Sequence, residues 1–437
     1  MTLKTRRFLF YGLFFIFILS GAGAILYSNG WRFNPASFHF KKTGAIYIET
    51  KPKDAFIKIN NIYFKNRSGI IQKGTLVPNL LSKSYKIELK KDGYLPYFKN
   101  ISVESAVVSE LIDVILIPQE IRKESLGNSQ KIKGDEFIAL SKDGNKIILK
   151  ESGSQMYYLY DLNNLSTAFN INVAFDNASG KEKTDIISIA FHPFESDKLI
   201  IETKKGLKIL DTNRLILNTI INEQPIAWAI GNSNIYYETG TKSQIRQLAD
   251  KPKSYTLYSY NLILKTKTAL NQKPLAIEKG SEIKKIGVDN ADNKIAFLDN
   301  FDDIYIFNPS NQELLQIAHS AKDFVFSPDN KKIAFLDNDG WVNIHFLEDL
   351  RQNINKKTGD VIRLNLENKS KIRKIIWHAD SEHLFVDYDN RFDFIEIDDR
   401  LPLNQYAIVN QSLQFFYDRE NNLIYFIQNN SLWKIAL

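Results

Sequence analysis

The chain has 437 residues, of which 44% are hydrophobic, 24% charged and 12% aromatic. These fractions are those of a globular protein and exclude bulk disorder. The length allows two or three domains. The sequence contains no cysteine, which excludes disulfides, thiol nucleophiles, iron–sulfur clusters and zinc sites that need thiolate. The net charge of +7 is too small to indicate nucleic-acid binding, so we expect no nucleic-acid partner.

The first thirty residues predict a membrane-spanning helix. Lys4, Arg6 and Arg7 precede an uncharged, predominantly apolar run over residues 8–27. About 20 such residues are the length a helix needs to cross a hydrocarbon core of ~30 Å. The cations lie on the N-terminal side of the run, which predicts a cytoplasmic N-terminus and an extracytoplasmic bulk at the plasma membrane. We therefore expect residues 1–30 to be a short tail and a single transmembrane helix.

A cleaved signal peptide is the alternative interpretation of this segment. Residues 22–24, Ala-Gly-Ala, resemble a small-residue cleavage site after a shorter apolar core. We favour an uncleaved anchor because the apolar run continues to Tyr27, and because Tyr27 and Trp31 suit the aromatic belt of a membrane interface. In both interpretations the bulk of the chain is extracytoplasmic.

Residues 43–118 have the pattern of a small β domain. Runs such as GAIYIET and YKIELKK alternate apolar and polar residues, the period of a strand with one buried face. The pairs Asn60-Asn61 and Asp92-Gly93 are typical of the turns between such strands. We expect this segment to form a β-sandwich.

Residues 44–61 and 74–103 resemble the PEGA domain, a family named for a Pro-Glu-Gly-Ala turn after its first strand. The positions that match the family pattern are Pro52, Ala55, Pro78, Gly93 and Tyr94. The positions that depart from it are Lys53 and Asp54, in place of Glu-Gly, and Asn60-Asn61, in place of Asp-Gly. The resemblance implies a non-catalytic β module of bacterial and archaeal envelope proteins, in which the matched residues have structural roles.

The rest of the chain, residues 119–437, is a repeat. Its clearest copy is FVFSPDNKKIAFLDNDGWVNIHFLED, residues 324–349. The other copies lie at residues 138–164, 188–214, 227–263, 286–312, 375–400 and 415–437. About seven copies, each with up to four strands and a period of about 46 residues, are typical of a propeller. The predicted fold class is therefore all-β, with a transmembrane helix, a PEGA-like sandwich and a seven-bladed β-propeller.

The repeat also resembles the TolB-like bacterial propellers, in which an inner strand ends in Ser-Pro-Asp-Gly and the next strand reads Lys-Ile-Ala-Phe. Residues 327–330 and 332–335 match this pattern, while the Trp-Asp pair of WD repeats is absent. The final copy stops at Leu437 after its third strand. Because an open sheet edge invites aggregation, we expect the segment from Ile117 to Ser125 to supply the missing fourth strand.

The histidines do not form a recognisable catalytic or metal pattern. His192 and His378 occupy the position of Ser327 in the repeat, which predicts turn residues. His378 and His383 do not have the HExxH spacing of a metalloprotease. Three more histidines lack any partner pattern: His39, His319 and His345.

Acidic and basic clusters are likewise expected to be turns and solvated loops. The acidic clusters are Asp299/Asp302/Asp303, Asp337/Asp339 and Asp387/Asp389. None has the spacing of a calcium loop, and Asp is a common turn residue. The lysine-rich stretch 242–253 lies in one of three long insertions, near residues 169–186, 240–254 and 350–372. Such insertions commonly build binding surfaces, and this stretch could contact an anionic wall polymer or lipid headgroups.

The sequence contains no phosphate-binding glycine loop, no GxSxG elbow and no SxxK. We therefore assign no catalytic, cofactor-binding or metal-binding residue and expect no cofactor. The leading hypothesis is a non-enzymatic membrane-anchored scaffold that displays its propeller to an envelope protein or a wall polysaccharide. The alternative is a hydrolase or lyase with a site in the central channel. A role in envelope assembly in the TolB manner rests on fold analogy alone.

Overall fold

A computed structural model describes residues 3–34, 38–69, 72–126, 132–180, 185–239, 254–273, 275–277, 281–350, 355–410 and 414–436. The chain divides into two compact units. The first unit consists of residues 1–120, 351–355 and 398–404. The second consists of residues 121–350, 356–397 and 405–437.

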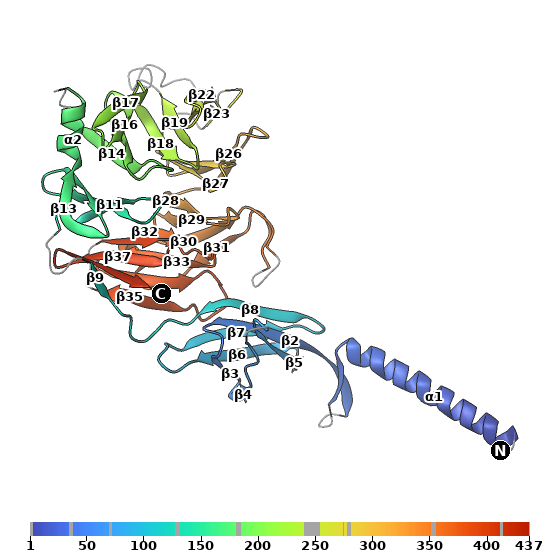
Figure 1. The fold of residues 1–437 in the computed structure, drawn as a ribbon. Helices are drawn as coiled ribbons and strands as arrows, with labels where there is room; N and C mark the ends of the chain where they lie inside the picture. The colour runs from blue at the N-terminus through green and yellow to red at the C-terminus, as the bar shows by residue number, and fades with distance from the viewer. Residues whose placement is uncertain are drawn as a thin grey trace. The chain divides into compact units, whose positions relative to one another are not determined.

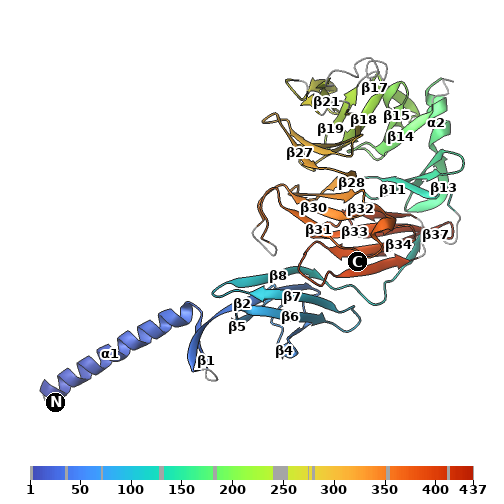
Figure 2. The same cartoon turned by 180° about the vertical axis from the view of Figure 1, so that it is seen from behind.

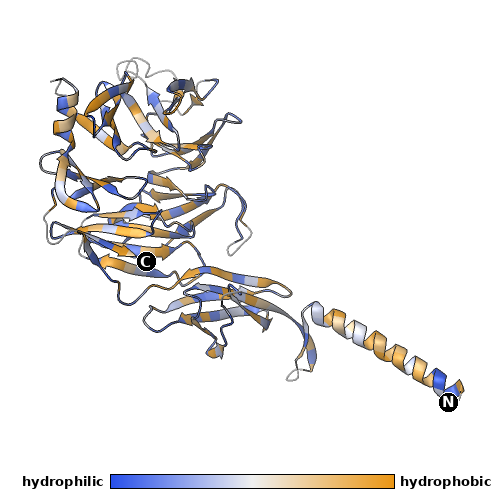
Figure 3. Ribbon diagram, viewed as in Figure 1, coloured by the Kyte–Doolittle hydropathy of each residue, from blue (hydrophilic) through white to orange (hydrophobic). Residues whose placement is uncertain are grey.

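The first unit begins with an apolar helix, α1 (Leu3–Ser28). Its 26 residues bury no side chain within the protein, and apolar residues cover it on all sides beyond its basic first turns (Figure 3). A helix with this surface is unfavourable in water and favourable in lipid, where its backbone groups remain paired. The predicted helix, long and apolar enough to span a membrane, is confirmed. Its orientation in a membrane stays a prediction.

Two four-stranded sheets form the rest of the first unit. One sheet contains β1 (Trp31–Asn34), β2 (His39–Lys51), β5 (Thr75–Leu81) and β8 (Val108–Ile115). The other contains β4 (Ile62–Phe64), β3 (Phe56–Ile59), β6 (Lys83–Lys90) and β7 (Tyr97–Val103). The alternating side chains predicted from the sequence meet in one core, to which both sheets contribute buried isoleucines such as Ile46 and Ile87.

A segment from much later in the chain, residues 398–404, also belongs to the first unit. Lys99 is fully buried, and its ammonium group donates hydrogen bonds to the carbonyl oxygens of Asp398 (3.2 Å) and Arg400 (2.7 Å). The guanidinium of Arg400 in turn donates to the carbonyl oxygen of Glu110 (2.9 Å). A buried cation must be compensated by polar partners, and these carbonyls satisfy that need. The repeat pattern gave no indication of this segment.

The second unit contains, in its described part, seven four-stranded antiparallel sheets in chain order (Figure 1). The first three sheets are β10 (Glu136–Leu140), β11 (Lys146–Glu151), β12 (Met156–Asp161), β13 (Asn164–Asn170); β14 (Ile186–Phe191), β15 (Lys198–Thr203), β16 (Gly206–Asp211), β17 (Ile216–Ile221); and β18 (Pro225–Ile230), β19 (Asn234–Thr239), β21 (Leu257–Asn261), β22 (Thr266–Ala269). The next three are β24 (Ile283–Val288), β25 (Ile295–Asp299), β26 (Ile304–Asn308), β27 (Glu313–Ala318); β28 (Ala321–Phe326), β29 (Lys332–Asp337), β30 (Val342–Phe346), β31 (Val361–Leu364); and β32 (Ile372–Trp377), β33 (His383–Tyr388), β34 (Arg391–Glu396), β35 (Gln405–Asn410). The seventh is β36 (Phe415–Asp418), β37 (Leu423–Gln428), β38 (Ser431–Ala436) and β9 (Glu124–Leu126), and a small extra pair is β20 (Ser254–Tyr255) with β23 (Leu275–Ala276).

Each of these sheets packs against the next one, and the seventh packs against the first. Shared apolar clusters join the first five sheets in succession. The indole N–H of Trp377 donates to the carbonyl of Val325 (3.0 Å) and connects the sixth sheet to the fifth. Stacked rings of Phe392 and Phe415, 4.6 Å apart, connect the sixth sheet to the seventh. A cluster that includes Tyr425 joins the seventh sheet to the first, so the unit is a β-propeller.

The ring closes with strands from distant parts of the chain. β9 pairs antiparallel with β38, with Ser125 opposite Trp433 and Leu126 opposite Leu432. Figure 2 shows the same red C-terminal sheet from behind. The prediction that the segment from Ile117 to Ser125 completes the last sheet is confirmed for its C-terminal end alone, because the pairing strand is Glu124–Leu126. The reason is the one expected, because without β9 the edge of β38 would have unpaired backbone groups.

The structure contains a second α-helix that the sequence analysis did not predict. α2 (Ile171–Ala178) lies in the first of the three predicted insertions. The side chain of Asn170 accepts a hydrogen bond from the backbone N–H of Val173 (3.1 Å), and Ile171, Ala174 and Phe175 are buried. This i, i+3, i+4 pattern is helical. The second unit is therefore not purely β.

The third predicted insertion, residues 350–372, is only partly a loop. It contains β31, the fourth strand of the fifth sheet, and a short 3-10 helix, η1 (Lys369–Lys371). Of the other predicted insertion, residues 240–253, which include the lysine-rich stretch 242–253, lie outside the described residues.

Candidate functional site

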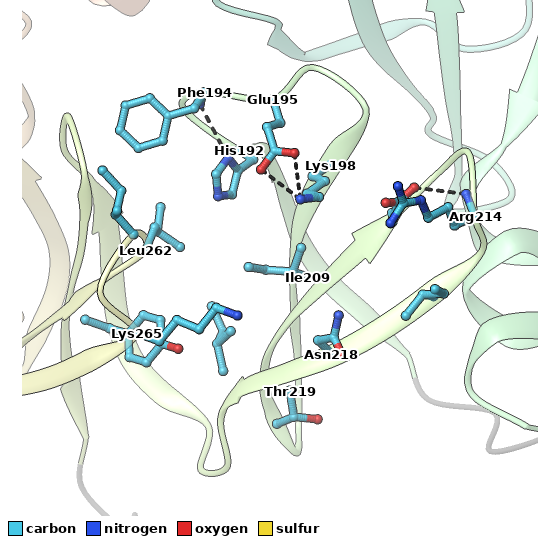
Figure 4. A pocket seen from close by; sticks show the side chains of 15 residues that line it. His192, Phe194, Glu195, Lys198, Ile209, Arg214, Asn218, Thr219, Leu262 and Lys265 are labelled. Carbon is cyan, nitrogen blue, oxygen red and sulfur yellow. Dashed lines mark hydrogen bonds and ion pairs between the residues drawn. The ribbon is translucent and has the colours of Figure 1, made fainter.

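A groove with a volume of about 630 Å³ lies between the second and third sheets (Figure 4). Its walls come from the turn after β14, from β16 and β17, and from the end of β21 with the turn that follows. The turn after β14 contributes His192 and Phe194, and the end of β21 contributes Leu262. Three segments far apart in the sequence thus form one site.

Large apolar side chains are exposed along this groove. Phe194 is 51% exposed, Ile216 48% and Ile263 65%, and the neighbouring Leu264 is 71% exposed. A turn holds the last two outward, because the side-chain oxygen of Asn261 accepts the backbone N–H groups of both Ile263 and Leu264. A cluster of exposed apolar residues beside a groove is typical of an interaction site.

Charged groups lie among the apolar ones. Glu195 and Lys198 form an ion pair of 2.6 Å. The Asp211 carboxylate accepts backbone N–H groups, the one of Arg214 at 2.9 Å, and this hydrogen bond is the main reason that the pKa of Asp211 is lowered. The guanidinium of Arg214 and the ammonium group of Lys265 have no ion pair within the described parts of the chain. The groove therefore has cations available for an anionic group.

His192 lies between this groove and a second cavity. Burial lowers the pKa of its imidazole, so the ring is neutral at pH ~7. Its Nδ1 accepts the backbone N–H of Phe194 (3.4 Å). His192 follows β14 directly, in the turn position that the sequence predicted.

The second cavity, of about 350 Å³, lies where the first strands of the first four sheets end. Its wall at the strand ends consists of Ala139, Leu140, Ala190, Phe191, Ile230 and Val288. The adjoining turns add Lys142 and Asp289. The Asp289 carboxylate accepts the backbone N–H of Asn293 (2.7 Å), and the residue is 2% exposed. This carboxylate therefore stabilises the turn in which it lies. This lining does not assemble an acid, a base and a metal site among the described residues.

His378, Asp380 and His383 are the one described group whose geometry could hold a metal ion. Both imidazole Nδ1 atoms face the carboxylate, at 3.0 Å from His378 and 2.8 Å from His383. Burial alone would raise the pKa of Asp380, but His383 and His378 outweigh it and hold that pKa well below its usual value. His378 and Asp380 lie in the turn between β32 and β33, and His383 is the first residue of β33.

The corresponding turn of the fifth sheet shows the same arrangement with other residues. There the Ser327 hydroxyl donates to Asp329 (2.5 Å) and Lys332 pairs with the same carboxylate (3.3 Å). His378 and His383 replace this serine and lysine around Asp380. We therefore interpret the three residues as a hydrogen-bonded group that stabilises this turn, in which His378 has the position that the sequence alignment predicted.

The predicted acidic clusters lie at turns after second strands. The Asp299 carboxylate accepts the N–H groups of Phe301 and Asp303, each at 2.9 Å. Asp337 accepts those of Asp339 (3.0 Å) and Trp341 (2.8 Å). The remaining cluster contains Asp387, whose carboxylate pairs with Arg373 at 2.8 Å. The carboxylates of Asp299 and Asp337 thus accept hydrogen bonds from their own turns, and that of Asp387 forms an ion pair with Arg373.

The remaining predicted histidines lie apart from both cavities. His39 is in β2 of the first unit, His319 pairs with Asp303 (2.8 Å), and His345 is buried in β30. The groove itself was not predicted. Its one sequence signal is the pair Ile263-Leu264, two aliphatic residues at a turn where polar residues are usual.

The sequence matches no family model. It also matches no curated protein. The PEGA assignment therefore stays a prediction.

Solved structures show similarity at the level of the fold. The oligogalacturonate lyase of Vibrio parahaemolyticus aligns with a TM-score of 0.50 and 9% identity, over 73% of this chain and 94% of that one. An oligogalacturonate lyase in complex with manganese gives 0.49 and 10%, over 72% and 96%. The Cps50 (Swd1) β-propeller domain of Myceliophteria thermophila gives 0.48 and 9%, over 72% and 100%. The chain has a propeller fold, and at these identities the similarity carries nothing about activity.

Proposed function

We propose that this protein is a single-pass, membrane-anchored, extracytoplasmic binding protein that displays a seven-bladed β-propeller and has no catalytic role. Support for the anchor is α1, whose apolar surface has no partner within the described protein. Support for the blade count is the succession of seven sheets, the last completed by β9. The PEGA-like module would connect the membrane helix to the propeller along the chain.

The observation that carries the binding role is the groove between the second and third sheets. Its exposed Phe194, Ile216 and Ile263 favour an apolar partner surface, and the available Arg214 and Lys265 favour acidic groups on that partner. Polysaccharides offer few apolar groups of this size. We therefore favour an envelope protein with an apolar and acidic segment over a wall polysaccharide as the ligand.

Site-specific crosslinking in cells tests this role. A photoreactive amino acid at Ile263 in the full-length protein is expected to capture a discrete partner, which the charged double substitution Ile216→Asp and Leu264→Asp abolishes. The matched control places the same photoreactive group at Leu315, an exposed residue (53%) on β27 of the fourth sheet. The same adducts from both positions, or none from Ile263, would contradict the binding role of the groove.

The alternative, a hydrolase or lyase in the channel, has one supporting observation. The cavity at the ends of the first strands is lined by Lys142 and His192, whose side chains can transfer protons. An enzyme there would release fragments from purified envelope polysaccharide, and Lys142→Ala would abolish the release. Fragment release that persists in this variant, or no release from any polymer, would count against the enzyme.

A further inference from the structure

A two-stranded extension, β1 with the first part of β2, directly follows the apolar helix. The backbone register places Trp31 opposite Lys42 and Phe33 opposite Phe40. Directly opposed residues share one face of an antiparallel pair, and successive residues alternate between faces. Trp31, Phe33 and Phe40 therefore lie on one face of the hairpin, and Arg32 lies on the other face.

The aromatic face of this hairpin is largely exposed. Phe33 is 51% exposed, Phe40 59%, and Phe38 in the hairpin turn 82%. The ring of Phe33 contacts those of Phe40 (5.4 Å between centroids) and Phe38 (6.2 Å) in edge-on geometry. Removing such aromatic rings from water is energetically favourable. Their exposure therefore indicates that this face binds a partner.

Cations surround these rings. Lys41 lies opposite Arg32 on the second face, and Lys42 borders the aromatic face opposite Trp31. Both lysines are exposed and have no ion pair within the ranges that the structure describes. Aromatic rings beside lysine and arginine are the composition of segments that lie at a membrane surface.

The hairpin is fixed to the end of α1. The Arg32 guanidinium lies 3.6 Å from the centre of the Tyr27 ring and donates to the Tyr27 carbonyl (2.6 Å). Gly30, at φ +82°, makes the turn out of the helix, and its carbonyl accepts the N–H of Thr43 (2.8 Å). A Cβ at Gly30 would meet the Thr43 carbonyl oxygen at 2.8 Å, so the close approach requires glycine. Arg32, on the face opposite the rings, and Gly30 therefore fix the hairpin to the last turn of the apolar helix.

We propose that residues 31–34 and 38–42 form a second membrane contact, in which the aromatic side chains lie among the lipid headgroups and Lys42, on the same face, binds lipid phosphates. This proposal rests on the proposed role of α1 as a membrane anchor. Continuity with that helix is what selects a lipid surface over another protein. The contact would restrict rotation and tilt of the first unit relative to the bilayer.

Fluorescent labelling of single cysteines tests the proposal, and the absence of native cysteine makes each label specific. The full-length protein would be reconstituted into phosphatidylcholine vesicles that contain phosphatidylglycerol. Phe38→Cys reports on the hairpin, and Tyr63→Cys, an exposed position (70%) in β4 of the same unit, is the matched control. Gly12→Cys, where a side chain meets no other atom within 4 Å, reports on α1.

We expect nitroxide lipids labelled near the headgroup to quench the Phe38 label at least ~2-fold more than the Tyr63 label. Nitroxides in the middle of the acyl chain should quench the Gly12 label. Quenching at Gly12 with equal, weak quenching at residues 38 and 63 would overturn the hairpin contact while the anchor stands. No quenching at Gly12 would instead refute the anchor itself.

Two further measurements test the role of the lipid phosphates and the alternative that a second copy of the chain covers the rings. Lys42→Glu is expected to reduce headgroup quenching of the Phe38 label in the phosphatidylglycerol vesicles, and unchanged quenching would refute the binding of phosphates. Emission of the Phe38 label that is typical of an apolar environment, is not quenched by headgroup nitroxides and is lost on dilution of the protein in lipid would show that a second copy covers the rings. That result would overturn the membrane contact.

Discussion

His345 is a buried titratable residue that the proposed function does not use. It is 7% exposed on β30, and its Nδ1 has no hydrogen-bond partner in the described structure. Burial lowers its pKa because the charged imidazolium loses solvation. The unfolded chain therefore takes up the proton more readily than the folded chain does.

This difference predicts an acid sensitivity. The contribution of His345 to the free energy of unfolding is complete above the unfolded-state pKa of about 6.5. It is lost as the pH falls from there through the lower folded-state pKa. We expect His345→Leu to reduce the loss of stability between pH ~7.5 and ~5.5, measured by urea unfolding. The exposed His319→Leu controls for the loss of a histidine, and an equal effect of both variants would contradict the prediction.

Gly287 shows how closely neighbouring sheets approach. It lies on β24 of the fourth sheet, and a Cβ built there would lie 2.8 Å from the buried ring of Phe324 on β28 of the fifth sheet. We expect Gly287→Ala to lower the free energy of unfolding by ~1–3 kcal/mol through overpacking. Phe324→Leu in the same chain should restore part of the loss, since it removes ring atoms at the clash. Unchanged stability of Gly287→Ala would show that the ring can move away.

β9 has three residues, and it completes the seventh sheet by pairing with β38. Replacing residues 124–126 with three glycines removes the packing of Leu126 and disfavours the extended backbone. We expect the free energy of unfolding to fall by ~2–3 kcal/mol and aggregation to increase, because the edge of β38 becomes available. The matched control replaces residues 121–123, which form no strand. Equal unfolding midpoints for both variants would mean that β9 does not hold the ring closed.

The strands could be predicted from the sequence, and α2 could not. The order of strand, polar turn and strand in residues 324–349 recurs along the chain and predicts the strands, although β29 and β30 are buried on both faces and do not alternate. The eight residues of α2 contain only three buried positions, and in so short a segment this pattern does not differ from loop composition. The groove was also beyond prediction, because its walls depend on which turns the ring brings together.

At the scale of the whole molecule, α1 predicts where the protein fractionates. Deletion of residues 1–28 should move the protein from the membrane fraction to the soluble fraction, since no other helix in the described structure is long and apolar enough to cross a membrane. Immunoblots of separated fractions measure this. A deletion product that stays with the membrane after a high-salt wash would contradict a single anchor.

Orientation is a separate prediction. Protease added to intact cells with a permeable outer layer should digest the bulk of the full-length protein and spare a cytosolic marker, because the basic residues Lys4, Arg6 and Arg7 favour the cytoplasmic side. Complete protection of the propeller from protease, with digestion after lysis of the cells, would place it in the cytosol.

The pairing of β9 with β38 also determines when the ring can close during biosynthesis. β9 emerges from the ribosome early, and its partner emerges only after the roughly 300 residues between Leu126 and Ser431 have been made. Until β38 has been made, β9 has no pairing partner, and the first and last sheets cannot pack against each other. A holdase that shields exposed β edges would therefore matter most for this protein in the moments before translation ends.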